Sequence, residues 1–177
     1  FGDRDLWIDT ALGIEPAPDD RDLPRGAVPY LPCSIDEIIT ALDAVPVREG
    51  DDFVDLGAGL GRVSLLAHLV TGSRARGIEL QPHLVELANA RAAALNLPVT
   101  IAVGDVAEAS LVGDVFFLYA PFNGGLLARA LARIDEAARD RSLVVCTVAL
   151  ELDVPWLALR SRPSATVTIY ATVPAVR

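Results

Sequence analysis

This chain has 177 residues, 52% of them hydrophobic, a composition that excludes an intrinsically disordered protein because it can bury a sizeable core. Its formal net charge of −9 argues against a nucleic-acid partner, since phosphate contacts need a basic face. No apolar run reaches the roughly 18 residues that a membrane-spanning helix requires, so we expect no membrane association. Cys33 and Cys146 stand far apart without a CxxC motif, which predicts no disulfide framework, no metal site and a reducing, cytoplasmic setting.

The first part of the chain is rich in proline and charged residues. Because prolines interrupt helices and strands, we interpret residues 1–33 as an irregular lead-in that wraps around the rest of the chain. A helix is predicted directly after it, over residues 34–45, where isoleucine and leucine recur at helical spacing. Ser34 is its candidate N-cap and stands three residues before Glu37, as in a capping box.

The rest of the chain alternates between short apolar strands and helices with one apolar stripe. The strands are expected at 52–57, 75–80, 99–105, 114–121, 142–150 and 166–173, and the helices at 63–70, 82–95 and 125–140. Strands separated by helices imply right-handed crossovers and a parallel sheet. The last strand alternates apolar and polar residues, which predicts an antiparallel strand near the sheet edge, with 156–162 as a candidate partner. We therefore predict one α/β domain over residues 34–177, a doubly wound sheet with helices on both faces.

The segment DLGAGLGR, residues 55–62, bends tightly between a strand and a helix. It lies at the carboxyl end of a strand, where an open parallel sheet binds its ligands. Its glycines have the spacing GxGxG, whereas a dinucleotide-binding turn needs GxGxxG to admit a pyrophosphate. An NAD-dependent oxidoreductase is therefore the weaker alternative. Asp55, two residues before the first glycine, is placed to hold a cationic amine, directly or through water.

Two further carboxylates follow neighbouring strands. Glu79 ends the second strand, 20 residues after Gly59, where a carboxylate can accept hydrogen bonds from both hydroxyls of a ribose. Asp105 follows the third strand and is placed to accept a hydrogen bond from an adenine amino group, with Val106 against the ring. These spacings predict a ligand with a ribose, an adenine and an amino-acid end, and they require no phosphate site.

DLGAGLGR, GIEL, GDV and YAPF occur in this order over roughly residues 30–140, and together they resemble the motifs of class I S-adenosylmethionine-dependent methyltransferases. The resemblance implies a Rossmann-like sheet of seven strands, the last antiparallel, and S-adenosylmethionine as cofactor. By this resemblance the methionine part would be held by Asp55, Gly57, Ala58 and Gly59, the ribose by Glu79 beside Leu80, and the adenine by Asp105 and Val106.

A second resemblance concerns the lead-in. VPYLPCSIDEII, residues 28–39, is similar to the Tyr-x-Pro segment of protein-lysine methyltransferases related to the Dot1 type, in which this segment closes over the cofactor. It implies that Tyr30 and Ser34 contact the cofactor. YAPF departs from the Asn/Asp-Pro-Pro-aromatic motif of enzymes that methylate bases or glutamine, which disfavours base methylation. Tyr119 and Phe122 would wall the acceptor site, and a role as plain core aromatics is equally open.

The sequence thus predicts an S-adenosylmethionine-dependent methyltransferase whose acceptor is a nitrogen or oxygen on a protein or a small molecule. The lead-in favours a protein lysine. Alignment is the main task in methyl transfer, so the chemistry requires no catalytic histidine or cysteine. The alternative from another class is a methyltransferase-like scaffold domain without catalytic activity.

Overall fold

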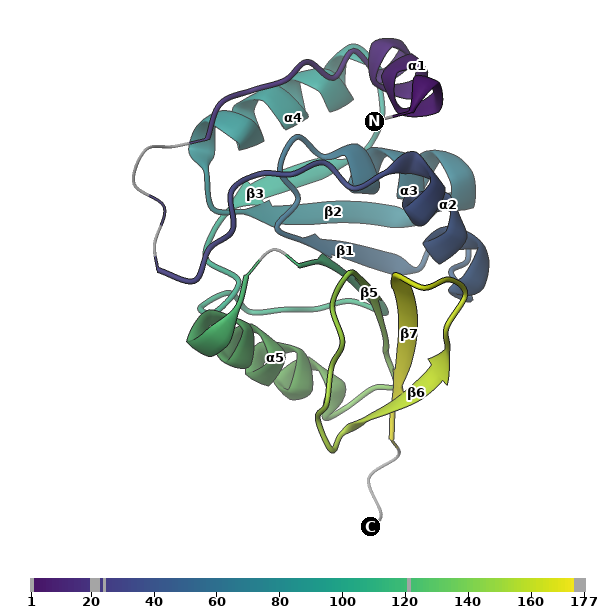
Figure 1. Cartoon of the computed structure of the whole chain (residues 1–177), viewed down its shortest axis with the longest axis vertical. Helices are drawn as coiled ribbons and strands as arrows, with labels where there is room; N and C mark the ends of the chain where they lie inside the picture. Colours follow the sequence, from purple (N-terminus) through teal and green to yellow (C-terminus); the bar gives the residue numbers. More distant parts are fainter. Residues whose placement is uncertain (1, 20–22, 24, 121, 174–177) are drawn as a thin grey trace.

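The structure, a computed structural model, describes residues 2–19, 23, 25–120 and 122–173. Within these residues seven strands form one sheet (Figure 1). They are β1 (Asp52–Leu56), β2 (Arg74–Glu79), β3 (Thr100–Val103), β4 (Val115–Tyr119), β5 (Val144–Val148), β6 (Leu157–Ser161) and β7 (Val167–Thr172). The helices of the described residues are α1 (Asp3–Leu12), α2 (Ile35–Ala44), α3 (Arg62–Thr71), α4 (Pro82–Ala94) and α5 (Gly124–Ala138). None of these helices is long and apolar enough to cross a membrane.

The strand order across the sheet is β3-β2-β1-β4-β5-β7-β6. β1 pairs in parallel with β2 and β4, β2 with β3, and β4 with β5. β7 lies antiparallel between β5 and β6. The predicted fold class is confirmed, including the antiparallel last strand and its pairing with residues 156–162. The chain order reverses between β1 and β4, and such a switch point is where open α/β sheets bind ligands.

Helices cover both faces of the sheet, because successive residues of the central strands point to opposite sides. Phe53 and Phe117 belong to the core beneath α2, α3 and α4, and their ring centroids lie 6.1 Å apart. Val54 and Phe116 belong to the second core, beneath α5. Burying each such side chain contributes about 1.5–3 kcal/mol. The two cores hold the central strands, and therefore the loops at their carboxyl ends, in fixed positions.

The prediction of an irregular lead-in is wrong for Asp3–Leu12, which form α1. The prolines begin only after this segment, so nothing in its sequence prevents a helix. The pattern gave no helical signal because α1 has no apolar stripe facing the core. Its buried residues are Asp5 and Leu12, while Leu6 and Trp7 are 68% and 69% exposed.

Candidate active site

A cavity of about 270 Å³ lies at the carboxyl ends of β1, β2, β3 and β4. One wall comes from the lead-in, namely Leu23, Arg25 and residues 27–31. The opposite walls come from the strand ends and from α5: Gly57, residues 78–81, residues 104–106, Tyr119, Ala120, Phe122, Leu126, Arg129 and Ala149. The switch point between β1 and β4 therefore coincides with a cavity between the sheet and the lead-in.

The glycine turn between β1 and α3 is held against β2. The backbone N–H groups of Gly57 and Ala58 donate to the carbonyl of Ile78 over 2.9 and 3.1 Å. Gly59 has a φ of +52°, and a Cβ at this position would lie 2.1 Å from Cε2 of Tyr30. Only glycine therefore lets the ring of Tyr30 rest on the turn. Burial raises the pKa of the Tyr30 hydroxyl, which keeps it protonated.

Glu79, at the end of β2, joins two loops of the site. Its Oε2 accepts a hydrogen bond from the N–H of Gly59 over 2.9 Å, and its Oε1 accepts one from the N–H of Gln81 over 2.9 Å. The side chain is 8% exposed and lines the cavity. A carboxylate has about four acceptor positions, so each oxygen keeps one that is open to a ligand.

Asp105 and Val106 form the cavity wall after β3. Asp105 Oδ1 accepts a hydrogen bond from the N–H of Ala107 over 2.8 Å, which fixes the turn. Within the described residues the structure assigns no hydrogen bond to its Oδ2. Val106 is 5% exposed and gives the wall an apolar surface. The pair offers one acceptor beside a flat apolar contact, as a purine base with an amino group requires.

The fold matches that of known methyltransferases. The family model described as "Histone methylation protein DOT1" matches residues 30–104. Among solved structures, an RNA methyltransferase from Salinibacter ruber in complex with S-adenosyl-L-homocysteine is 25% identical, with a TM-score of 0.67, over 82% of this chain and 95% of that chain. Together with the strand order 3-2-1-4-5-7-6, this structural likeness identifies the fold class. The chain has the fold of class I S-adenosylmethionine-dependent methyltransferases.

Other solved structures share the fold of this methyltransferase at lower identity. Geranyl diphosphate C-methyltransferase from Streptomyces coelicolor A3(2) is 19% identical, with a TM-score of 0.56, over 63% of this chain and 43% of that chain. MtNAS in complex with MTA and tNA is 18% identical, with a TM-score of 0.63, over 79% of this chain and 60% of that chain. This chain thus spans less than two thirds of the length of both. No curated protein sequence matches it.

The residues of this methyltransferase's cavity fit the class's cofactor. Glu79 has an open acceptor position on each oxygen, as two ribose hydroxyls require, and the Asp105–Val106 pair suits an adenine. Gly57 lines the cavity near Tyr30, where the resemblance implies the methionine part. Leu80, also predicted as a contact, lines the cavity next to Glu79.

Four residues predicted to contact the cofactor are not among those that line the cavity: Ser34, Asp55, Ala58 and Gly59. Ser34 caps α2, because its Oγ accepts from the N–H of Glu37 over 3.3 Å and donates to Oε2 of Glu37 over 2.9 Å. Asp55 is 3% exposed and accepts a hydrogen bond from Ser64 Oγ over 3.2 Å. Burial raises the pKa of Asp55 to about 7, and the charge of Glu79 adds to the rise. For these four residues, direct contact with the cofactor stays a prediction.

The aromatic residues proposed for the acceptor site, Tyr119 and Phe122, both line the cavity. Phe122 is 7% exposed and also belongs to the core beneath α5, so its side chain forms a fixed wall. Tyr119 is half-buried, and burial raises the pKa of its hydroxyl. Pro121 of the YAPF motif lies outside the described residues.

Two alanines at the cavity have a backbone that favours glycine. Ala120 follows β4 with a φ of +36°, and Ala149 follows β5 with a φ of +52°. Both line the cavity. A left-handed backbone at a residue with a Cβ costs on the order of 1–3 kcal/mol and tends to occur at functional sites. The sequence gave no signal for this strain, because neither position holds glycine or asparagine.

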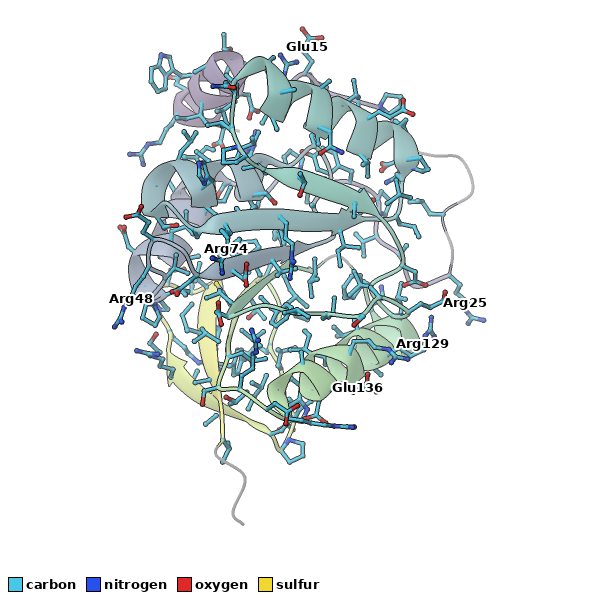
Figure 2. The ribbon with its side chains drawn as sticks, turned by 180° about the vertical axis from the view of Figure 1, so that it is seen from behind. Glu15, Arg25, Arg48, Arg74, Arg129 and Glu136 are labelled. Atoms are coloured by element: carbon cyan, nitrogen blue, oxygen red, sulfur yellow. The ribbon has the colours of Figure 1, made fainter. Side chains whose placement is uncertain are left out.

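Sequence reasoning also missed the residues that dock the lead-in and those at the rim. Asp19 Oδ1 accepts from the N–H of Tyr30 over 2.7 Å and from Nε2 of Gln81 over 2.9 Å, which fastens the lead-in to the start of α4. Arg25 from the lead-in and Arg129 from α5 line the cavity and lie at the same edge of the molecule (Figure 2). No spacing in the sequence relates these distant positions.

Proposed function

We propose that this chain transfers the methyl group of S-adenosylmethionine to a nitrogen or oxygen of an acceptor molecule. The observation that carries the proposal is the meeting of Gly57, Glu79 and Asp105 in one cavity, each at the end of a different parallel strand. The match to the DOT1 model and the likeness to the Salinibacter ruber enzyme support it.

The side chains of the cavity would act by orientation. When bound, the cofactor supplies an electrophilic methyl group on a sulfonium. Glu79 would hold the ribose hydroxyls, and Asp105 with Val106 would hold the adenine. Tyr119 and Phe122 would wall the acceptor site, while Tyr30 and the lead-in exclude water. Alignment of this kind can supply about 7–11 kcal/mol of the barrier.

The acceptor class that the family match favours is a protein lysine. The matched family is described by histone methylation, and the match begins at Tyr30, the first residue of the Tyr-x-Pro segment. We also infer a reducing, cytoplasmic location, which is supported by the two cysteines, Cys33 and Cys146, both free and buried.

A second candidate acceptor is an anionic molecule. Arg25 and Arg129 line the cavity, and no ion pair joins either of them to another described residue. Two guanidinium groups attract a phosphate or a carboxylate and repel the ammonium of lysine. The name of the Salinibacter ruber enzyme, an RNA methyltransferase, makes RNA the macromolecular form of this candidate.

The test of activity is transfer of a tritiated methyl group from S-adenosylmethionine into a fractionated cell lysate. Protease-sensitive label would support a protein acceptor, ribonuclease-sensitive label would support RNA, and label in the low-mass fraction would support a small molecule. No label in any fraction would contradict the proposed activity.

A thermal-shift comparison with S-adenosylmethionine, S-adenosylhomocysteine and NAD tests the cofactor. A ligand at about 100 times its dissociation constant adds about 2.7 kcal/mol to the free energy of unfolding. We expect stabilisation by the two sulfur compounds and none by NAD. Stabilisation by NAD alone would favour the oxidoreductase alternative, and binding without methyl transfer would favour a scaffold.

A further inference from the structure

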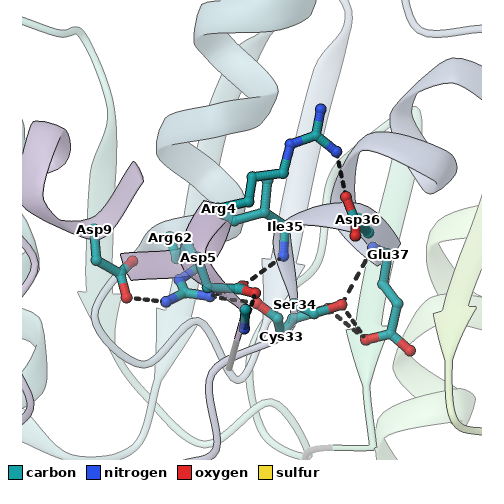
Figure 3. Close-up of polar contacts among 10 residues, drawn as sticks. Arg4, Asp5, Asp9, Cys33, Ser34, Ile35, Asp36, Glu37 and Arg62 are labelled. Carbon is teal, nitrogen blue, oxygen red and sulfur yellow. Dashed lines mark hydrogen bonds and ion pairs between the residues drawn. The ribbon is translucent and has the colours of Figure 1, made fainter. Parts of the chain in front are cut away.

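Arg62, the first residue of α3, is a charged side chain buried directly behind the glycine turn. It is 3% exposed. Its Nη1 donates to Oδ1 of Asp5 over 3.1 Å and to the carbonyl of Cys33 over 2.8 Å. Its Nη2 forms an ion pair with Asp9 (Figure 3). One guanidinium group, carried by the residue that follows the glycine turn, thus joins α1 to the end of the lead-in.

Besides this ionic cluster, α1 buries little apolar surface of its own. Asp5 and Leu12 are its buried residues, while Trp7 faces the solvent. Asp5 Oδ1 also accepts a hydrogen bond from the N–H of Ile35 over 2.9 Å, at the start of α2. Burial raises the pKa of Asp5, but hydrogen bonds from the backbone of Ile35 and Gly2, with the charge of Arg62, outweigh it and hold that pKa below its ordinary value.

In the sequence, the partners of Arg62 flank the segment that forms the cavity wall. Asp9 precedes the wall-forming residues Leu23, Arg25 and 27–31, and Cys33 follows them. Binding both flanks to one side chain closes the intervening chain into a loop and lowers the number of conformations it can adopt. The same loop places Tyr30 against Gly59.

We propose that Arg62 is a positioning residue that holds the lead-in closed over the cavity and thereby sets the affinity for the cofactor. The proposal rests on the proposed function for its cofactor, but the closure itself concerns the chain alone. A ligand that binds only the closed form has an apparent dissociation constant equal to the intrinsic one divided by the closed fraction. Loss of the Arg62 contacts lowers that fraction.

The first test is amide hydrogen exchange on the chain without ligand. We expect Arg62→Met and the milder Asp9→Asn to speed exchange in residues 25–33 by about tenfold and to leave β1 and β4 unchanged. Arg74→Met is the matched control, because Arg74 pairs with Asp52 over 2.9 Å at the amino end of β2, away from the cavity. Unchanged exchange in residues 25–33 of folded Asp9→Asn protein would overturn the proposal, also where Arg62→Met fails to fold.

The second test measures the affinity for S-adenosylhomocysteine by calorimetry. We expect the dissociation constant to rise about tenfold in Arg62→Met, to rise less in Arg62→Lys, and to stay constant in Arg74→Met. In the methyl-transfer assay the KM for S-adenosylmethionine should rise while kcat is retained. Equal affinity in the Arg62 variants and the unaltered chain would contradict the positioning role. A lack of binding by the unaltered chain would instead overturn the proposed function. The hydrogen-exchange experiment would still test whether Arg62 holds the lead-in closed over the cavity.

Discussion

Replacing Glu79 by glutamine separates its binding role from its structural role. The carboxylate accepts hydrogen bonds from the N–H groups of both Gly59 and Gln81. An amide has one acceptor oxygen, so one of these N–H groups would face an NH₂ group. Hydrogen bonds to charged groups contribute about 1.5–3 kcal/mol each, so we expect the free energy of unfolding to fall by about 2 kcal/mol.

The same substitution weakens the proposed ribose contact. Losing a charge-assisted hydrogen bond of about 1.5–3 kcal/mol corresponds to an affinity for S-adenosylhomocysteine that is about 10- to 100-fold lower. Urea denaturation measures the first effect and calorimetry the second. Glu136→Gln is the matched control, because Glu136 pairs with Arg133 on the surface of α5 (Figure 2) and does not line the cavity. An unchanged affinity in folded Glu79→Gln protein would refute the ribose assignment.

The remaining predictions concern stability. The pKa of Asp55 is about 7 in the folded chain and about 3.9 in the unfolded one, so the folded chain retains a proton that the unfolded chain releases. This retained proton contributes up to about 4 kcal/mol to the free energy of unfolding, and the contribution is complete below about pH 4 and is lost as the pH rises through 7. Asp55→Asn should remove this pH dependence from the free energies that urea denaturation measures. The same pH dependence in the variant and in the unaltered chain would contradict the assignment. Gly59→Ala should cost more stability than Gly124→Ala, because both positions have a positive φ but only the Cβ at Gly59 would overlap Tyr30; equal losses in thermal denaturation would show that the ring moves without cost. Ser34→Ala should lower the free energy of unfolding by about 1 kcal/mol through loss of the cap of α2, and an unchanged denaturation midpoint would exclude that role.

The part of the site at the strand ends was predictable because of a simple geometric rule. The carboxyl ends of parallel strands meet at one edge of a sheet, so motifs that each follow a strand converge there. Gly57, Glu79 and Asp105 are up to 48 positions apart in the sequence, yet all line the same cavity. The chemistry of these residues, together with their positions after predicted strands, then indicates the ligand class.

The lead-in was not predictable in the same way. Arg62 contacts Asp5 and Asp9 at separations of 57 and 53 residues, and an ion pair leaves no periodic pattern in the sequence. α1 also lacks the apolar stripe by which helices are recognised, so its sequence gave no sign of the helix. The left-handed backbone of Ala149 also leaves no pattern in the sequence, because the surrounding structure imposes it.

A crystal structure of this chain with S-adenosylhomocysteine tests most directly where the cofactor binds. We expect the adenosine in the cavity beneath the lead-in, with the ribose hydroxyls on Glu79 and the adenine beside Asp105 and Val106. An adenosine bound elsewhere on the chain, or crystals in which this cavity stays empty at saturating ligand, would contradict it.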